Sequence, residues 1–441
     1  MKIRGLIVAS VVFLALGGTL YWSNHRKPSE DTAKASADTP PSILKLDQSA
    51  ITRLEVTKKD AAPVVLAKSA SGDWQITEPK PLKADDSAVS GVLSTVSSLN
   101  SERLVEEKAV DLKPYGLQSP AVQVGITGKD NKTQKLLIGD DTPTGGAVYA
   151  KLDGDARVYT MSSFGKTSVD KGLNDLRDKH LLAVSSDKIS RIELIRKNQD
   201  IEFGRNKDEW QILKPKPLRA DSLQVDDVAR KLSDARMDIG GSESPKDLDS
   251  AFAKASPFVS AKVTDQSGTQ ELQIRKSKDA YYAKSSTVEG VYKVAADLGE
   301  GLDKGLDDFR NKKLFDFGFN DPNKIEIHDG AKAYFLARNG EDWWSNGKKM
   351  DANSAQTLVS RLRDLSADKF PDSGFANPAI ELTVTSDDGK KTEKVSIAKS
   401  GDSYIGKREN EPALYHLTSN LIDDLRKSAE EVKPAAAALA K

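Results

Sequence analysis

One motif occurs three times in this chain of 441 residues, and it sets the size of the folding unit. In each copy a tryptophan lies in a segment of alternating polarity, and an aspartate follows a few positions later. Neighbouring copies are about 135 residues apart, which is the size of a domain and far above the length of a solenoid repeat. The spacing therefore predicts one module used three times. The paired residues are Trp74 with Asp85, Trp210 with Asp221, and Trp343 with Asp351.

Alternation of apolar and polar residues predicts that each module begins with antiparallel strands. The opening segments 51–56, 189–194 and 324–327 place apolar side chains at every second position. This period of two is typical of half-buried strands, and short polar turns between successive segments favour a meander. In the second half of each module, an X-Pro step such as Ser119-Pro120 disfavours helix and introduces four further strands.

The three aspartates mark the expected beginning of a helix in each module. An aspartate side chain can accept hydrogen bonds from the free amides of a first turn, so Asp85, Asp221 and Asp351 are predicted N-caps. The residues after each aspartate repeat apolar side chains at i, i+3 and i+7, which predicts one buried face. A second helix is expected to close each module. The resulting order, β-β-β-α-β-β-β-β-α, is an α+β fold with two helices packed on an antiparallel sheet.

The ends of the chain differ in composition from these modules. Residues 28–42 contain no large apolar side chain, so they cannot bury enough surface to fold and are expected to form a flexible tether. The predicted organisation is a membrane anchor at 1–27, the tether at 28–42, and a disordered tail at 431–441. The three modules are placed at 43–186, 187–319 and 320–430.

The N-terminus predicts contact with a lipid bilayer. Residues 5–22 carry no charge and end in Tyr21-Trp22, and a helix of this length spans about 27 Å, close to the hydrocarbon thickness of a membrane. A cleaved signal peptide is the alternative, but the segment is long for one and lacks an Ala-x-Ala site. We expect a single-pass inner-membrane protein whose N-terminus lies inside and whose bulk is periplasmic.

Composition excludes several classes of function. Lys and Arg together number 66, as do Asp and Glu, and no basic stripe suited to phosphates is present, so nucleic acid is not an expected partner. The absence of cysteine excludes disulfides, thiolate zinc sites, a cysteine nucleophile and a lipoprotein anchor. The four histidines are far apart, and no nucleophile elbow is present. We therefore predict no catalytic, cofactor-binding or metal-binding residues.

The repeated aromatic residues have two interpretations. A tryptophan at a fixed strand position is usually a core anchor, and we expect this of Trp74, Trp210 and Trp343. Trp344 interrupts the pattern and is expected to be more exposed. Tyrosines recur on the late strands of each module, and together with Trp344 they suggest a surface for a partner. The speculative partner-binding residues are Trp344, Tyr281 and Tyr404.

These motifs resemble a bacterial family, the domain of unknown function 4340. The resemblance rests on the N-terminal anchor, the step at 72–85, the Tyr115-Gly116-Leu117 step with its proline, and the closing helix at 175–178. It covers roughly residues 44–427 and is strongest in the first module. The family is envelope-associated and often encoded beside gliding-type ABC transporter subunits, which implies that this protein works alongside such a transporter. The family offers no catalytic residues.

Three functions follow as hypotheses. The first is a non-enzymatic, membrane-anchored extracytoplasmic accessory or scaffold subunit of an ABC-transporter-type envelope complex. The second is a tandem binding module for a cell-envelope glycan or peptide, in which repeated copies would raise avidity. The third is a hydrolase whose site the sequence does not reveal.

Overall fold

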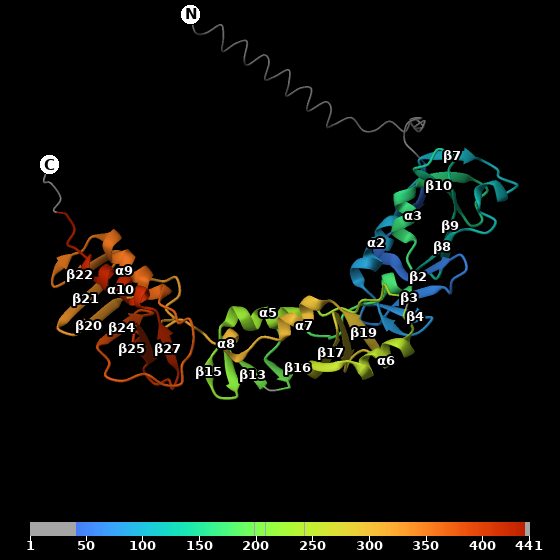
Figure 1. The fold of residues 1–441 in the computed structure, drawn as a ribbon. Helices are drawn as coiled ribbons and strands as arrows, with labels where there is room; N and C mark the ends of the chain where they lie inside the picture. Colours follow the sequence, from blue (N-terminus) through green and yellow to red (C-terminus); the bar gives the residue numbers. More distant parts are fainter. Residues whose placement is uncertain (1–40, 198, 208, 242, 437–441) are drawn as a thin grey trace, which may run out of the picture. The chain divides into compact units, whose positions relative to one another are not determined.

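The computed structural model describes residues 41–436 apart from positions 198, 208 and 242. The chain divides into two compact units, of which the first ends at Asp178 and the second begins at Lys179 (Figure 1). The first unit contains one large sheet, and the second contains two. Every strand pair in these sheets is antiparallel. The α+β class predicted from the sequence is therefore confirmed.

The large sheet of the first unit has nine strands in the order β5-β4-β3-β2-β8-β9-β10-β11-β7. A separate pair, β1 and β6, joins residues before and after helix α2. The strands are β1 Ser42–Lys45, β2 Ile51–Lys58, β3 Val64–Lys68, β4 Trp74–Glu78, β5 Leu82–Lys83, β6 Ser98–Asn100, β7 Arg103–Glu106, β8 Val122–Gly128, β9 Thr133–Asp141, β10 Ala147–Leu152 and β11 Val158–Ser162. The helices are η1 Gln48–Ala50, α2 Asp86–Ser97, η2 Lys113–Tyr115, α3 Ser163–Val169 and α4 Leu173–Leu176.

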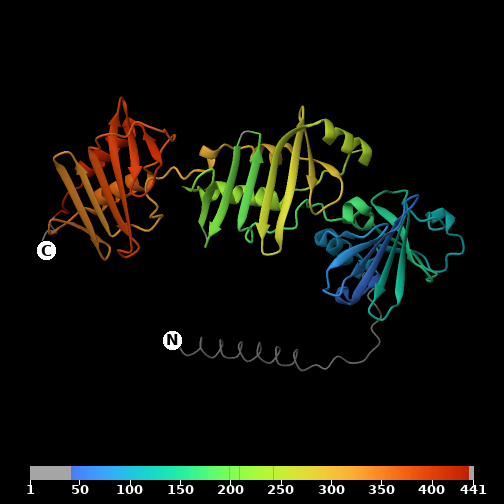
Figure 2. The same ribbon diagram turned by 90° about the horizontal axis from the view of Figure 1, so that it is seen from below.

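The second unit begins with an eight-stranded sheet in the order β15-β14-β13-β12-β16-β17-β18-β19, whose strands are seen side by side in Figure 2. Its strands are β12 Arg191–Arg196, β13 Gln199–Asn206, β14 Glu209–Lys214, β15 Leu218–Arg219, β16 Ser256–Asp265, β17 Gly268–Ser277, β18 Ala280–Ser285 and β19 Val291–Val294. Its helices are α5 Ser222–Ser233, α6 Pro245–Lys254, α7 Ala296–Leu302 and α8 Leu306–Phe309.

The last sheet also has eight strands, in the order β23-β22-β21-β20-β24-β25-β26-β27. Helices α9 and α10 contact each other, and their buried residues join the apolar residues of the sheet in one cluster. The strands are β20 Lys324–Asp329, β21 Lys332–Asn339, β22 Asp342–Ser345, β23 Lys348–Lys349, β24 Ile380–Ser386, β25 Lys391–Ser400, β26 Ser403–Arg408 and β27 Leu414–Leu417. The helices are α9 Ala352–Asp364 and α10 Ser419–Glu430.

The three large sheets share one strand order over eight positions. Each contains a two-residue strand directly before the capped helix, which the sequence did not predict because two residues carry no readable period. The closing helix differs between the sheets. It is divided into two short helices in the first two, at α3 and α4 and at α7 and α8, but is a single 12-residue helix, α10, in the third.

The long helix of each module begins at its predicted aspartate. The Asp85 carboxylate accepts hydrogen bonds from Ser87 and Ala88, both at 3.0 Å. Asp221 caps α5 and Asp351 caps α9 in the same way. The apolar stripes that follow are buried among the strands, and each module has its own cluster. The buried helical residues are Val89, Val92, Leu93 and Val96 in α2, Val225, Val228, Ala229 and Leu232 in α5, and Ala355, Leu358, Val359 and Leu362 in α9.

The same aspartates tie the end of each module to its beginning. The backbone N–H of Asp85 donates to the Leu176 carbonyl, that of Asp221 to Phe309, and that of Asp351 to Lys433, each at 2.8 Å. Isolated bridges complete the edge of each sheet. Each bridge joins the residue before the aspartate to the residue after its carbonyl partner. These bridges join Ala84 with Arg177, Ala220 with Arg310, and Met350 with Pro434.

These bridges distinguish Arg426 from Arg177 and Arg310. Arg426 lies inside α10, where it pairs with Asp329 at 2.8 Å, whereas Arg177 and Arg310 form the bridges just beyond α4 and α8. The segment 431–441 was expected to be disordered. Within its described part, however, the backbone N–H of Ala435 donates to the Lys349 carbonyl at 2.9 Å, so the chain is held in place as far as the sheet edge.

The module boundaries lie earlier than the predicted positions 186 and 319. Leu181 and Leu182 are buried in the core of the second module, and the N–H of Leu181 donates to the Ala235 carbonyl. Leu314 and Phe315 are likewise buried in the third core. These residues follow closely on the bridges of the preceding module, so no separate linker stands between the second and third modules.

The predicted anchor and most of the predicted tether fall in residues 1–40, which lie outside the described residues. Within the part of the chain that the structure describes, no helix combines the length and apolar character needed to cross a membrane.

The capping role of Asp221 leads to a stability prediction. Replacing Asp221 by Ala removes the acceptor for the Leu223 and Gln224 amides, which lie 3.1 and 3.3 Å from its Oδ1. We expect the free energy of unfolding of the second unit to fall by about 1 kcal/mol. Urea unfolding of the full chain measures this change. Asp221→Asn, which keeps an acceptor oxygen, should lose less, and an equal loss in both variants would contradict the capping role.

Candidate functional site

The three repeated tryptophans are structural. Trp74, Trp210 and Trp343 are 8%, 2% and 3% exposed and belong to the three core clusters. A basic side chain lies over two of the rings, with Lys68 Nζ 5.4 Å from the Trp74 centroid and the Arg205 guanidinium 4.6 Å from that of Trp210. None of these rings presents a free face of the size that a stacked ligand needs.

Two of the three speculative partner-binding residues are inside the protein. Tyr281 is 2% exposed and packs edge-on against Phe258, with ring centroids 5.3 Å apart. Tyr404 is 8% exposed, and its hydroxyl accepts a hydrogen bond from Arg426 Nη1 at 2.8 Å. Both rings are therefore buried, and neither offers the exposed surface that the prediction of a partner site requires.

Trp344 lies on the outer face of the third sheet and is 37% exposed. It stands opposite Ala337 on β21, and Phe335, two residues earlier on that strand, is 40% exposed on the same face. The Phe335 ring contacts His328 edge-on at 5.5 Å between centroids. These residues form a small aromatic face, which we call the third-sheet face. The positions that match Trp344 in the other motifs are Gln75 and Gln211.

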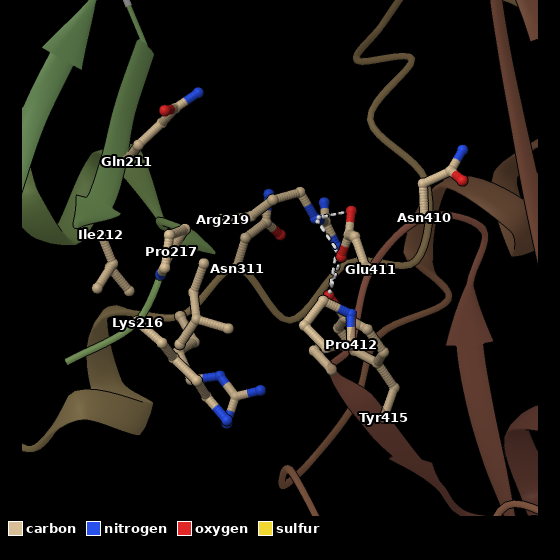
Figure 3. Close-up of a pocket in the computed structure, with 13 residues that line it drawn as sticks. Gln211, Ile212, Lys216, Pro217, Arg219, Asn311, Asn410, Glu411, Pro412 and Tyr415 are labelled. Atoms are coloured by element: carbon tan, nitrogen blue, oxygen red, sulfur yellow. Dashed lines mark hydrogen bonds and ion pairs between the residues drawn. The ribbon is translucent and has the colours of Figure 1, made fainter. Parts of the chain in front are cut away.

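A concave site lies in the second unit, where the second and third modules adjoin (Figure 3). It is a pocket of about 460 Å³, within the range of small-molecule and peptide sites. One side comes from β14, β15 and the connection between them, and the other comes from the loop between β26 and β27. The lining residues are Gln211, Ile212, Lys216, Pro217, Leu218, Arg219, Arg310, Asn311, Asn410, Glu411, Pro412, Ala413 and Tyr415.

Arg219 is the central polar residue of this pocket, and Figure 3 shows it extended from β15 toward Glu411 and Tyr415. Its Nε lies 3.1 Å from Glu411 Oε1, and its Nη2 donates to the Tyr415 hydroxyl at 3.0 Å. Its Nη1 pairs with Asp316, and its Nη2 also donates to the Lys313 carbonyl. One guanidinium of the second module therefore contacts four residues of the third.

A second layer of polar contacts holds the anionic partners of Arg219. The Tyr415 hydroxyl donates to Glu411 Oε2 at 2.9 Å, and Arg408 Nε donates to Glu411 Oε1 at 2.7 Å. Arg408 also pairs with Glu393, a carboxylate that is only 4% exposed and that accepts from the backbone N–H of Asp316 at 3.1 Å. The cluster is thus paired and hydrogen-bonded on both sides, as buried charge requires.

The electrostatics of the cluster favour its charged form. Burial opposes the charge on Arg219, but Asp316, Tyr415 and Glu411 outweigh burial and raise the pKa of the guanidinium above its ordinary value. The pKa of the Tyr415 phenol is raised above its ordinary value, because burial raises it by more than the neighbouring Arg219 lowers it. Both groups therefore keep their ordinary protonation states at neutral pH. The cluster is suited to holding the modules together rather than to transferring protons.

Among the described residues, no group of three or more His, Asp or Glu side chains is placed to hold a metal ion.

Sequence reasoning missed this cluster. Arg219 occupies the place of Lys83, whose Nζ pairs with Asp178 at 2.8 Å within the first unit. The change from Lys to Arg was a signal, because a guanidinium can serve several acceptors at fixed geometry whereas an ammonium acts as a point charge. The acceptors themselves, Asp316 and Glu411, gave no signal because they lie far along the chain.

Comparison with known proteins supplies a family match. The family model described as "Domain of unknown function (DUF4340)" matches residues 74–247 and 210–379. No curated protein matches the chain.

Two solved structures from Pseudomonas aeruginosa were also found. They are a DNA polymerase III subunit beta, with 8% identity over 85% of this chain and 92% of that chain and a TM-score of 0.15, and a DNA polymerase sliding clamp with ligand, with 8% identity over 85% and 93% and a TM-score of 0.14. At these TM-scores neither likeness bears on fold or function.

The Arg219 cluster predicts a large effect from one substitution. Arg219→Ala leaves Asp316 and Glu411 without their shared cation, so we expect a loss of about 2 kcal/mol in the free energy of unfolding, less than for a fully buried pair because the Arg219 side chain is 20% exposed. Urea unfolding and hydrogen exchange at residues 311–316 measure it.

Arg157→Ala is the matched control, since it removes a pair with Asp155 in which the arginine is 52% exposed, and we expect little change there. Equal stability of the two variants would contradict the role of Arg219.

Proposed function

The chain belongs to the DUF4340 family, whose domain has no assigned activity, and from that premise we propose that it is a non-enzymatic scaffold subunit of a membrane-bound envelope complex. In this proposal three tandem modules follow an N-terminal membrane anchor at residues 5–22 and project on the periplasmic side. The expected partners are subunits of an ABC-type transporter. The association with a transporter rests on the family resemblance.

The observation that carries the scaffold proposal is the joining of the second and third modules through the Arg219 cluster. Two modules joined by ion pairs, hydrogen bonds and a short connection resist separation, and a maintained connection between modules is what a scaffold must provide. Apolar contact adds to this joining, because Leu218 of the second module also packs against the third core. The Arg310 guanidinium lies 3.4 Å from the centroid of Phe370 in the third module.

Affinity purification tests the scaffold proposal. The full chain carrying a C-terminal tag should be recovered in the membrane fraction, and after gentle solubilisation it should retain transporter subunits in fixed ratio. Protease added to spheroplasts should digest the modules if they are periplasmic. Recovery in the soluble fraction would contradict the anchor, and recovery from membranes without a transporter subunit would contradict the partnership.

A second candidate, a binding module for an envelope glycan, is favoured by one observation. The third-sheet face presents Trp344 and Phe335 at diagonal positions of neighbouring strands, and exposed aromatic rings suit the apolar faces of sugars. The residues matching Trp344 in the first two modules are glutamines, so this face belongs to the third module alone.

Sedimentation with cell-wall polymer tests this candidate. The wild-type chain should sediment with purified peptidoglycan, and Trp344→Ala should lose most of the bound fraction while Leu223→Ala, which alters an exposed apolar residue elsewhere, should keep it. Absence of sedimentation by the wild-type chain would eliminate glycan binding.

A further inference from the structure

The Arg219 pocket does not end at Arg219. A second pocket of about 430 Å³ shares Lys216, Arg310, Pro412 and Ala413 with the first, so the two form one groove. We call this groove the junction groove. It lies wholly in the second unit, and its two halves meet at these four shared residues. An occupant that fills it must be extended.

The two halves of the junction groove differ in chemistry. The first pocket has apolar walls, which include Ile212, Leu218 and the rings of Pro217 and Pro412. The second is polar and adds Lys407 to the two shared cations, Lys216 and Arg310. An extended occupant therefore needs an apolar group at one end and anionic groups at the other.

The charge of the groove is not balanced by its own carboxylates. Glu411 is already engaged by Arg219 and Arg408, and Asp372 is the remaining carboxylate of the lining. Lys216 and Lys407 are exposed, and within the described residues neither forms an ion pair.

Arg310 lines the groove with a side chain that is 11% exposed. It pairs with Asp307 at 3.1 Å and stacks on Phe370, which fixes its position while it lines both pockets. Cations held beside an apolar wall attract an anionic group both by charge and by the lower cost of bringing it to a partly desolvated site.

The backbone around Lys216 excludes one mode of peptide binding, the addition of a β-strand. Lys216 lies between Pro215 and Pro217, and neither proline has an N–H to offer a further strand. Addition of a β-strand along this segment is therefore blocked, and recognition must use side chains. The side-chain amide of Asn410 lines the same pocket and can meet a peptide backbone without a continuous ladder, whereas the amide of Asn311 is engaged by Asp316 and Lys313.

From these features we propose that the junction groove binds a short, extended, acidic peptide segment of a partner protein, with an apolar side chain in the Arg219 pocket and carboxylates at Lys216, Arg310 and Lys407. This site rests on the proposed scaffold function and identifies the part of the scaffold that would hold its partner.

The test uses a fluorescein-labelled synthetic peptide in which two leucines precede three glutamates. With the full-length chain we expect a saturable rise in anisotropy that weakens as salt increases, since the contacts are ionic. The double variant Lys216→Glu with Lys407→Glu should bind at least tenfold more weakly. Lys399→Glu, an exposed lysine on β25 outside the groove, should bind like the wild type. A peptide with glutamines in place of the glutamates should not bind.

Four outcomes would overturn the groove assignment: no saturable binding, equal binding by all variants, equal binding of the glutamine peptide, or full displacement of the peptide by millimolar citrate or phosphate, which would indicate a site for small anions. The scaffold proposal is judged separately. If transporter subunits co-purify equally with wild type and the double variant, the groove assignment fails while the scaffold survives. If nothing co-purifies but the peptide binds, the scaffold proposal fails and the groove remains.

Discussion

Each module depends on one aspartate that makes two kinds of contact. In the second module the Asp221 carboxylate caps α5, while its backbone N–H binds the carbonyl of Phe309 near the end of the module. Asp221 therefore holds together the start of α5, the edge of the sheet and the last residues of the module. Asp85 and Asp351 make the same pair of contacts in the other modules, so the place at which each module closes follows from a residue recognisable in the sequence.

The junction groove exists because residues that close the second module also contact the third module. Arg219 is the second residue of the two-residue strand β15, next to the bridge between Ala220 and Arg310, so the closing contact of one module places a guanidinium against the next. The paired carboxylates satisfy that guanidinium and leave the neighbouring Lys216 and Lys407 for other ligands. Structural pairing and the proposed recognition thus use adjacent residues with separate tasks.

The parts of the fold that could be predicted were those with a local signal. Alternation revealed the strands, and the aspartates revealed the helix starts. Tyr281 and Tyr404 show the limit, because a tyrosine on a strand has the same sequence pattern whether its ring faces the core or solvent. The helix that closes each module shows a related limit. Leu425 is buried as Leu176 is, but it lies within the 12-residue helix α10, whereas Leu176 ends the four-residue helix α4, so a buried leucine does not reveal the length of its helix. The Arg219 cluster joins distant segments and has no local pattern at all.

The closeness of two bridges has a mechanical consequence. The bridge at Arg310 ends the second module, and the bridge between Lys313 and Ser366 begins the third, so only Asn311 and Lys312 lie between them. The N–H of Asn311 is itself bonded to the Arg219 carbonyl. The connection between the two modules therefore contains no loose segment that could extend under tension. A pull on the third module would load the edge hydrogen bonds of both sheets and the Arg219 ion pairs before it reached either apolar core, so these contacts would set the force at which the two modules separate.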